Sequence, residues 1–212
     1  APGYGGSTPL APEAPLARDY AARLAGFLDA LGERRVFLAG HSLGALMAGS
    51  FAAGWPLRVK RLLLASAALG HARLSPEARA KRLKDRLDDM AALGPAGLAE
   101  KRAASLLVKD AVPEKVAQVR RVMAALDPAG YAQAARMLSQ GDLLADAPAI
   151  KAPTLVVCGA KDATTTPATC RELADAIQGA RYGEIPDAAH GLYVDAPKAF
   201  WAALDEHMKD AA

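Results

Sequence analysis

The five residues 40–44, with the sequence GHSLG, constrain the fold of this chain more than any other feature. They follow the apolar run 36–39 and precede the apolar stretch 45–48, so a buried strand leads into the segment and a buried helix leaves it. In a G-x-S-x-G turn between strand and helix, the positions two before and two after the serine must be small because the turn is sharp. A glycine-flanked serine also occurs in ordinary strand–helix turns, but the flanking strand and helix favour the strained turn. We therefore expect the Ser42 hydroxyl at the carboxyl end of a parallel strand, above a helix N-terminus.

Composition is typical of one globular domain. The chain has 212 residues, of which 52% are hydrophobic and 23% are charged, enough for a sizeable core. The net charge of +3 comes from 26 basic and 23 acidic residues spread along the chain, which predicts no nucleic-acid partner. The densest basic stretch, residues 79–86, is diluted by Asp85, Asp88 and Asp89. We interpret it as a solvated helix face rather than a membrane or nucleic-acid patch.

Other sequence signals bear on location and cofactors. No apolar run approaches the roughly 20 residues that a membrane-spanning helix needs, and no signal-peptide pattern opens the chain. The two cysteines, Cys158 and Cys170, lack metal-ligand spacing, and Cys158 lies in an apolar strand pattern typical of a packing residue. The sequence therefore predicts a cytoplasmic protein with no membrane partner, no metal and no cofactor.

Helices and short apolar strands alternate along most of the chain. Strands are predicted at 36–39, 61–65, 154–158 and 181–185. Helices around them are predicted at 15–31, from 43 onward, 167–177 and 197–208. No strand pattern interrupts residues 75–141, where helices are predicted from 75 onward, at 95–108, at 113–126 and at 129–138. The fold class is therefore α/β, with a mostly parallel sheet covered by helices; residues 1–70 and 142–212 form the core, and residues 71–141 form a helical cap insertion.

Three residues could make Ser42 chemically active. A serine hydroxyl needs a base within hydrogen-bond reach, and the base needs an orienting carboxylate. His190 follows the last predicted strand, and Asp162 follows the strand 154–158 through the turn 159–161. Both are expected on the same edge of the sheet as Ser42, in the chain order Ser, Asp, His that G-x-S-x-G enzymes use. We predict Ser42 as the nucleophile, His190 as the general base and Asp162 as the orienting acid.

Other residues compete for these roles less well. His41 adjoins Ser42, but its side chain is expected to point elsewhere at a sharp turn. The two remaining histidines, at the start of the insertion and near the end of the last helix, are His71 and His207. The aspartates at less suitable places are Asp142, Asp146 and Asp187. Asp162 and His190 themselves have an alternative interpretation as turn or capping residues.

The expected site also includes an oxyanion donor and a pocket. The backbone N–H of Leu43 is expected to bind the tetrahedral oxyanion. The cap is expected to close a mostly apolar pocket over Ser42. The candidate lining residues, each of which could equally pack the core or the cap, are Leu43, Met90, Met123, Met137 and Leu192.

Four stretches together resemble the α/β-hydrolase fold superfamily. They are PGYGGS at 2–7, LAGHSLGALMA at 38–48, PTLVVCGAKDATTTP at 153–167 and IPDAAHGLYVDAP at 185–197. They occur in family order and span essentially the whole chain. The short helical cap and the stretch 127–143 are similar to the 3-oxoadipate enol-lactonase branch, and meta-cleavage-product hydrolases and cofactor-free perhydrolases look similar at this level. The resemblance implies a serine hydrolase that takes a small carboxylic ester or enol-lactone through an acyl-enzyme.

The resemblance also implies that a full family member has further strands before residue 1, and a loop there that carries a second oxyanion donor. The strand leading to Ser42 would then present an unpaired edge, which favours aggregation. We expect the chain alone to be poorly stable unless a second copy covers this edge, which leaves a homo-oligomer open.

Three alternatives remain open beside ester or lactone hydrolysis of a small-molecule substrate. The same three residues could hydrolyse a C–C bond in a vinylogous diketone. They could transfer the acyl group to an acceptor other than water. A non-catalytic ligand-binding module of the same fold is the alternative from a different class.

Overall fold

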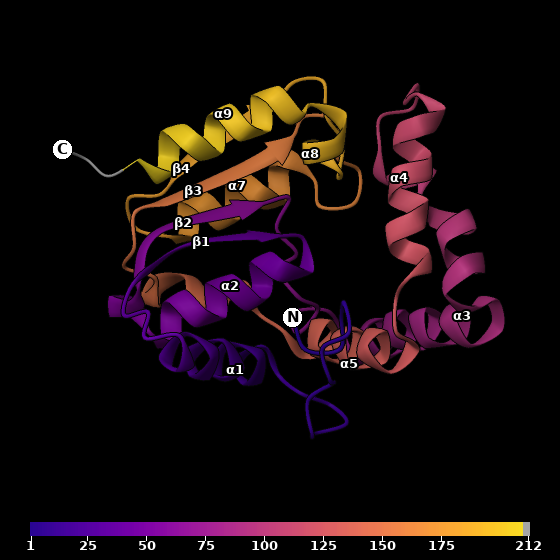
Figure 1. The fold of residues 1–212 in the computed structure, drawn as a ribbon, viewed down its shortest axis with the longest axis horizontal. Coiled ribbons are helices and arrows are strands. Elements are labelled where there is room, and N and C mark those ends of the chain that lie inside the picture. Colours follow the sequence, from indigo (N-terminus) through magenta and orange to yellow (C-terminus); the bar gives the residue numbers. More distant parts are fainter. Residues whose placement is uncertain (210–212) are drawn as a thin grey trace.

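A four-stranded parallel sheet forms the centre of the computed structural model, which describes residues 1–209 (Figure 1). The strands lie side by side in chain order, and each pairs in parallel with the next. They are β1 (Val36–His41), β2 (Val59–Ala65), β3 (Thr154–Gly159) and β4 (Arg181–Ile185). All six residues of β3 are buried, which explains its continuous apolar sequence. The predicted α/β class with a parallel sheet covered by helices is confirmed.

Helices pack on both faces of the sheet (Figure 1). Side chains alternate along β2, so Leu62 and Leu64 join one buried cluster while Leu63 and Ala65 join the other. The first cluster draws on the helices α1 (Ala17–Ala30), α2 (Leu43–Gly54) and α7 (Pro167–Ala176). The second draws on α8 (Leu192–Asp195) and α9 (Pro197–Met208). The sheet is therefore the middle layer of three. These helices leave uncovered the edge where the carboxyl ends of the strands lie, and a site can form there.

Between β2 and β3 the chain forms helices joined by turns and loops, with no strand among residues 66–153. The elements are α3 (Pro76–Arg102), α4 (Pro113–Ala124), α5 (Pro128–Gln140) and α6 (Leu143–Asp146). Three of the helices that begin with proline have a polar side chain at the preceding position that accepts a hydrogen bond from the first turn. These capping residues are Ser75, Asp127 and Thr166.

The helix α3 bends sharply at Gly94. The φ of Gly94 is 61°, in the left-handed region that glycine adopts most easily, and Pro95 follows it. The helix predicted at 95–108 is therefore the second half of α3, and it ends at Arg102 before a 3₁₀ turn at Ala104–Leu106. In Figure 1 the second half of α3 lies beside α4, away from the sheet.

The strand β1 lies at one end of the sheet and pairs with β2 alone among residues 1–209. Phe37, in this strand, is 40% exposed, unlike the apolar residues of β3. Within the same residues, no helix is both long and apolar enough to cross a membrane.

Candidate active site

Ser42 lies at the apex of a strained turn between β1 and α2. Its φ is 52°, which is unusual for any residue with a side chain. Gly40 allows this turn because a Cβ there would overlap the backbone of Gly44. The Ser42 N–H donates to the carbonyl of Ala65 at 2.9 Å, which ties the turn to the end of β2. The Leu43 N–H belongs to the first turn of α2, where helix N–H groups have no acceptor within the helix.

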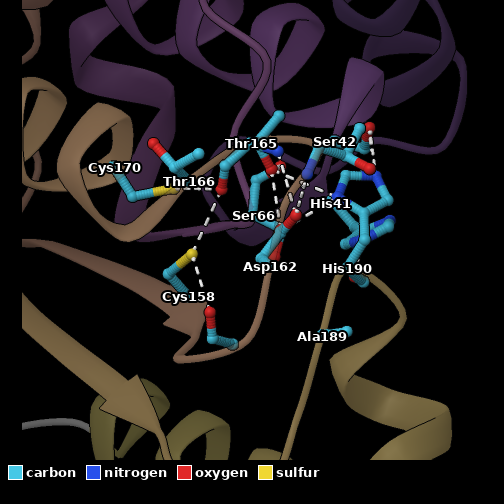
Figure 2. Close-up of polar contacts among 12 residues, drawn as sticks. His41, Ser42, Ser66, Cys158, Asp162, Thr165, Thr166, Cys170, Ala189 and His190 are labelled. Carbon is cyan, nitrogen blue, oxygen red and sulfur yellow. Dashed lines mark hydrogen bonds and ion pairs between the residues drawn. The ribbon is translucent and has the colours of Figure 1, made fainter. Parts of the chain in front are cut away.

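His190 and Asp162 reach Ser42 from the loops after β4 and β3. The Nε2 of His190 lies 2.9 Å from Ser42 Oγ, and its Nδ1 lies 3.0 Å from Asp162 Oδ2 (Figure 2). These distances give one hydrogen-bonded chain from the hydroxyl to the carboxylate. For both bonds to form with a neutral imidazole, Nδ1 carries the proton and Nε2 faces the hydroxyl as an acceptor. The structure thus brings together the three residues that the sequence singled out.

The carboxylate of Asp162 is buried and fully bonded. Its Oδ1 accepts the N–H groups of Thr164 at 2.8 Å and Thr165 at 2.9 Å. Burial raises the pKa of Asp162, but the hydrogen bond and charge of His190, with the N–H of Thr165, outweigh it and lower the pKa to about 2. Asp162 is therefore ionised at neutral pH and can stabilise a positive charge on His190.

Thr165 is a residue that the sequence analysis did not single out. Its Oγ1 lies 2.9 Å from Asp162 Oδ2, 2.9 Å from the carbonyl oxygen of Ser66 and 3.1 Å from His190 Nδ1 (Figure 2). One buried hydroxyl thus contacts both the acid and the base. The signal in the sequence is the run of three threonines that begins two residues after Asp162, since hydroxyl residues close to an aspartate often complete its turn.

His41 forms its side-chain hydrogen bond with the loop of His190 rather than with the Ser42 hydroxyl. Its Nε2 lies 2.8 Å from the carbonyl oxygen of His190, so Nε2 carries the proton and donates. The two rings lie 4.9 Å apart. Burial and the nearby His190 lower the pKa of His41 to about 4, so it stays neutral near pH 7. His41 therefore supports the position of His190 and does not compete as the base.

A cavity of about 600 Å³ opens over Ser42 and His190. Of the predicted lining residues, Leu43 and Met123 line it. Met137 and Leu192 instead pack in the two core clusters, because their side chains face the sheet layers rather than the insertion. Met90 is buried within the insertion and is not among the residues that line the cavity. Apolar atoms make up most of the cavity lining, as predicted, and arginines and tyrosines add polar groups that the prediction did not include.

The basic stretch 79–86 is not a purely solvated face. Its Arg82 and Arg86 line the cavity, whereas Lys81 and Lys84 point outward and pair with Asp85 and Asp88. These arginines and lysines alternate along one helix, so the sequence pattern did not distinguish the residues that face the cavity from those that face solvent. His71 also lines the cavity, and His207 is buried with its Nε2 2.9 Å from the carbonyl oxygen of Leu62.

The cysteines are buried and form no disulfide. The Sγ atoms of Cys158 and Cys170 lie 3.3 Å and 3.7 Å from the carbonyl oxygen of Thr165 (Figure 2). Cys158 is fully buried in β3, as predicted for a packing residue. Among residues 1–209, no group of three or more His, Cys, Asp or Glu side chains could hold a metal ion.

Comparisons with known proteins agree with the fold. The model of the alpha/beta hydrolase fold family matches residues 1–197. The enol-lactonase from Burkholderia xenovorans is 31% identical, with 97% of this chain and 77% of that chain covered and a TM-score of 0.86. A thermophilic esterase from Thermogutta terrifontis is 28% identical, with 96% and 75% covered and a TM-score of 0.85. A bromoperoxidase from Bacillus anthracis, at 20% identity and a TM-score of 0.82, shares the fold.

One curated protein also matches part of the chain. Polyketide synthase ThaQ of Burkholderia thailandensis is 32% identical over 121 residues. The match covers 55% of this chain and 5% of that protein, so the chain corresponds to a small part of it.

Proposed function

Because the chain belongs to the alpha/beta hydrolase fold family, we propose that it is a serine hydrolase that cleaves a small carboxylic ester or lactone. The observation that carries this proposal is the hydrogen-bonded chain from Ser42 Oγ through His190 to Asp162, at 2.9 Å and 3.0 Å, beside a cavity of about 600 Å³. The names of the two similar solved structures, an esterase and an enol-lactonase, support the same class of substrate.

In the proposed first step, Ser42 attacks the carbonyl carbon of the substrate. His190 Nε2 takes the hydroxyl proton as the Oγ–C bond forms, and Asp162 stabilises the resulting imidazolium. The Leu43 N–H and the N-terminal end of α2 face the oxygen on which negative charge develops. His190 then gives its proton to the leaving alcohol oxygen as the C–O bond breaks, which leaves an acyl group on Ser42.

In the second step, water replaces the alcohol. His190 removes a proton from water, the water oxygen bonds to the acyl carbon, and the bond to Ser42 Oγ breaks as His190 returns the proton. The products are a carboxylic acid and the free enzyme. For a lactone, the alcohol and the acid are two ends of one molecule.

The direct test is labelling with a fluorophosphonate probe, followed by intact-mass spectrometry. An activated Ser42 displaces fluoride and gives one adduct on the chain, and Ser42→Ala gives none. We also expect Ser42→Ala to lose at least about 10⁴-fold in kcat for p-nitrophenyl butyrate, because the nucleophile itself is removed. Folded protein that is neither labelled nor turns over this ester would overturn the proposal and favour the ligand-binding alternative.

A further inference from the structure

Arginine side chains form part of the lining of the cavity that contains Ser42. Those that line it are Arg73, Arg82, Arg86 and Arg102. The two carboxylates that also line it are Asp142 and Glu172, so four positive charges face two negative ones. Arg73 Nε donates to both oxygens of Asp142 at 3.0 Å. The other three arginines make no ion pair within residues 1–209.

Arg82 and Arg86 differ from the lysines of the same helix in whether an ion pair balances their charge. Lys81 Nζ lies 2.7 Å from Asp85, Lys84 pairs with Asp88, and Lys101 Nζ lies 2.7 Å from Asp89. Those lysines have their charge balanced within α3. Arg82 and Arg86 lie one turn apart on the face that lines the cavity, where like charges at this spacing destabilise a helix. Arg82 and Arg86 thus carry positive charge on the face beside Ser42 that no ion pair within residues 1–209 balances, and Arg79, which is also unpaired there, does not line the cavity.

The bend at Gly94 brings a third arginine to the same place. Along a straight helix, Arg86 and Arg102 would lie about 24 Å apart. Because α3 bends at Gly94, both line one cavity of about 600 Å³. The fold therefore concentrates guanidinium groups that the sequence separates.

Polar neighbours of these arginines point to a ligand rather than to an internal partner. Burial, with the charges of Arg86 and Arg82, lowers the pKa of His71 to about 4. The ring is therefore neutral near pH 7 and does not add to the positive charge of the arginines. Tyr131 lines the same cavity, and its hydroxyl is buried and has no hydrogen-bond partner among the described residues. A buried hydroxyl without a partner is costly unless a ligand binds it.

Building on the proposed function, we propose that the cavity binds an ester or lactone that carries a second, anionic oxygen group, a carboxylate or a phosphate. Arg82 and Arg86 recognise this group, with Arg102 and the Tyr131 hydroxyl beside them. Arginine suits this role because its planar donors match carboxylate and phosphate oxygens in pairs. The anionic group thereby places the reacting carbonyl at Ser42.

The test compares two esters that differ in one charge. Mono-p-nitrophenyl glutarate carries a free carboxylate, and methyl p-nitrophenyl glutarate has the same acyl chain with that carboxylate blocked. Release of p-nitrophenolate reports on both. We expect kcat/KM to be at least about tenfold higher for the free carboxylate, which is the scale of one hydrogen bond to a charged group.

The variant that tests the arginines is Arg86→Gln, and its matched control is Arg121→Gln. Arg121 is an exposed arginine of α4 that does not line the cavity, so both variants remove one positive charge from the insertion. We expect Arg86→Gln to reduce the preference for the charged ester about tenfold, mainly through KM, and Arg121→Gln to leave the preference unchanged. Arg86→Lys should restore part of the preference. Equal kcat/KM for the two esters in the wild type, or equal effects of the two variants, would overturn the anion site.

Calorimetric binding of glutarate and of inorganic phosphate separates this inference from the proposed function. Binding of either ion by the wild type that weakens in Arg86→Gln, but not in Arg121→Gln, supports the anion site even if neither ester is hydrolysed. The tighter of the two ions identifies the anionic group as a carboxylate or a phosphate. Turnover of the esters with no binding of either ion, and no preference between them, would leave the hydrolase standing and remove the anion site.

Discussion

The strands at the centre of the sheet and the helices α3 and α4 of the insertion differ in how their residues are buried. Every residue of β3 is buried, whereas only three of the 27 residues of α3 are buried, and none of α4. The insertion instead carries surface pairs of lysine and aspartate and the cavity arginines. The sheet is thus held mainly by apolar burial, which stabilises a protein far more than surface ion pairs do.

This difference separates the residues that position the proposed catalytic groups from those that would recognise the substrate. Ser42, Asp162 and His190 each follow a strand, so buried strands fix where their side chains meet. The insertion supplies Arg82, Arg86 and much of the cavity wall, from helices whose outward residues touch little. Changes to the groups fixed by the sheet should therefore affect catalysis and stability strongly, and changes on the exposed or cavity-facing residues of α3 and α4 should affect mainly the choice of substrate.

Among variants that keep the Ser42 nucleophile, the largest effect is expected from Asp162→Asn. The amide keeps the shape of the side chain but cannot stabilise a positive His190 or fix the proton on Nδ1. We expect a loss of about 10³- to 10⁴-fold in kcat for p-nitrophenyl butyrate, with little change in KM. Circular dichroism of the variant is the control for folding. A loss below tenfold in kcat would mean that catalysis does not need the negative charge of Asp162.

The same variant should change how stability depends on pH. The folded-state pKa of Asp162, about 2, lies below its ordinary value of 3.8, so the ionised carboxylate stabilises the fold above about pH 4. This contribution disappears as the pH falls from about 4 towards 2, and it amounts to about 2 kcal/mol. Urea denaturation at several pH values should show a smaller acid destabilisation in Asp162→Asn than in the wild type. Identical profiles would contradict the lowered pKa.

A matched pair of leucine substitutions tests the difference in packing. Leu64, in β2, is 0% exposed and Leu93, in α3, is 42% exposed. We expect Leu64→Ala to lower the free energy of unfolding by about 3 kcal/mol, because it removes buried methyl groups and leaves a cavity. Leu93→Ala should cost below about 1 kcal/mol. Equal losses in urea denaturation would show that the insertion is packed as tightly as the sheet.

Local sequence patterns predicted most of the sheet and the residues that meet at its edge. The apolar runs predicted β1, β2 and β3 within two residues of their ends, and β4 at 181–185. Ser42, Asp162 and His190 could be singled out because each follows a strand, and parallel strands end at one edge of a sheet. The spatial meeting of these side chains therefore follows from topology, which short patterns reveal.

The cavity could not be predicted in the same way. Met137 and Leu192 are apolar residues on helices, and the pattern does not say which apolar layer they join. Arg82 and Arg86 lie in a mixed-charge helix, and only the packing of α3 against its neighbours decides which charges face the cavity. The bend at Gly94, which adds Arg102, depends on the backbone of one glycine.

Among the changes expected to lower kcat, substitution of Thr165 should have the smallest effect. It tests whether a single hydroxyl helps the loop after β3 to position Asp162 and His190. Its hydroxyl contacts Asp162, His190 and the Ser66 carbonyl, so Thr165→Val leaves buried oxygens with one partner fewer while keeping nearly the same volume. We expect a loss of about tenfold in kcat, and a raised apparent pKa for Asp162 in the acid unfolding profile, because a hydrogen bond to its charged form is lost. Thr165→Ser keeps the hydroxyl and should recover most of the activity. If valine and serine behave alike, the hydroxyl has no positioning role, and the loop after β3 orients Asp162 through its backbone N–H groups alone.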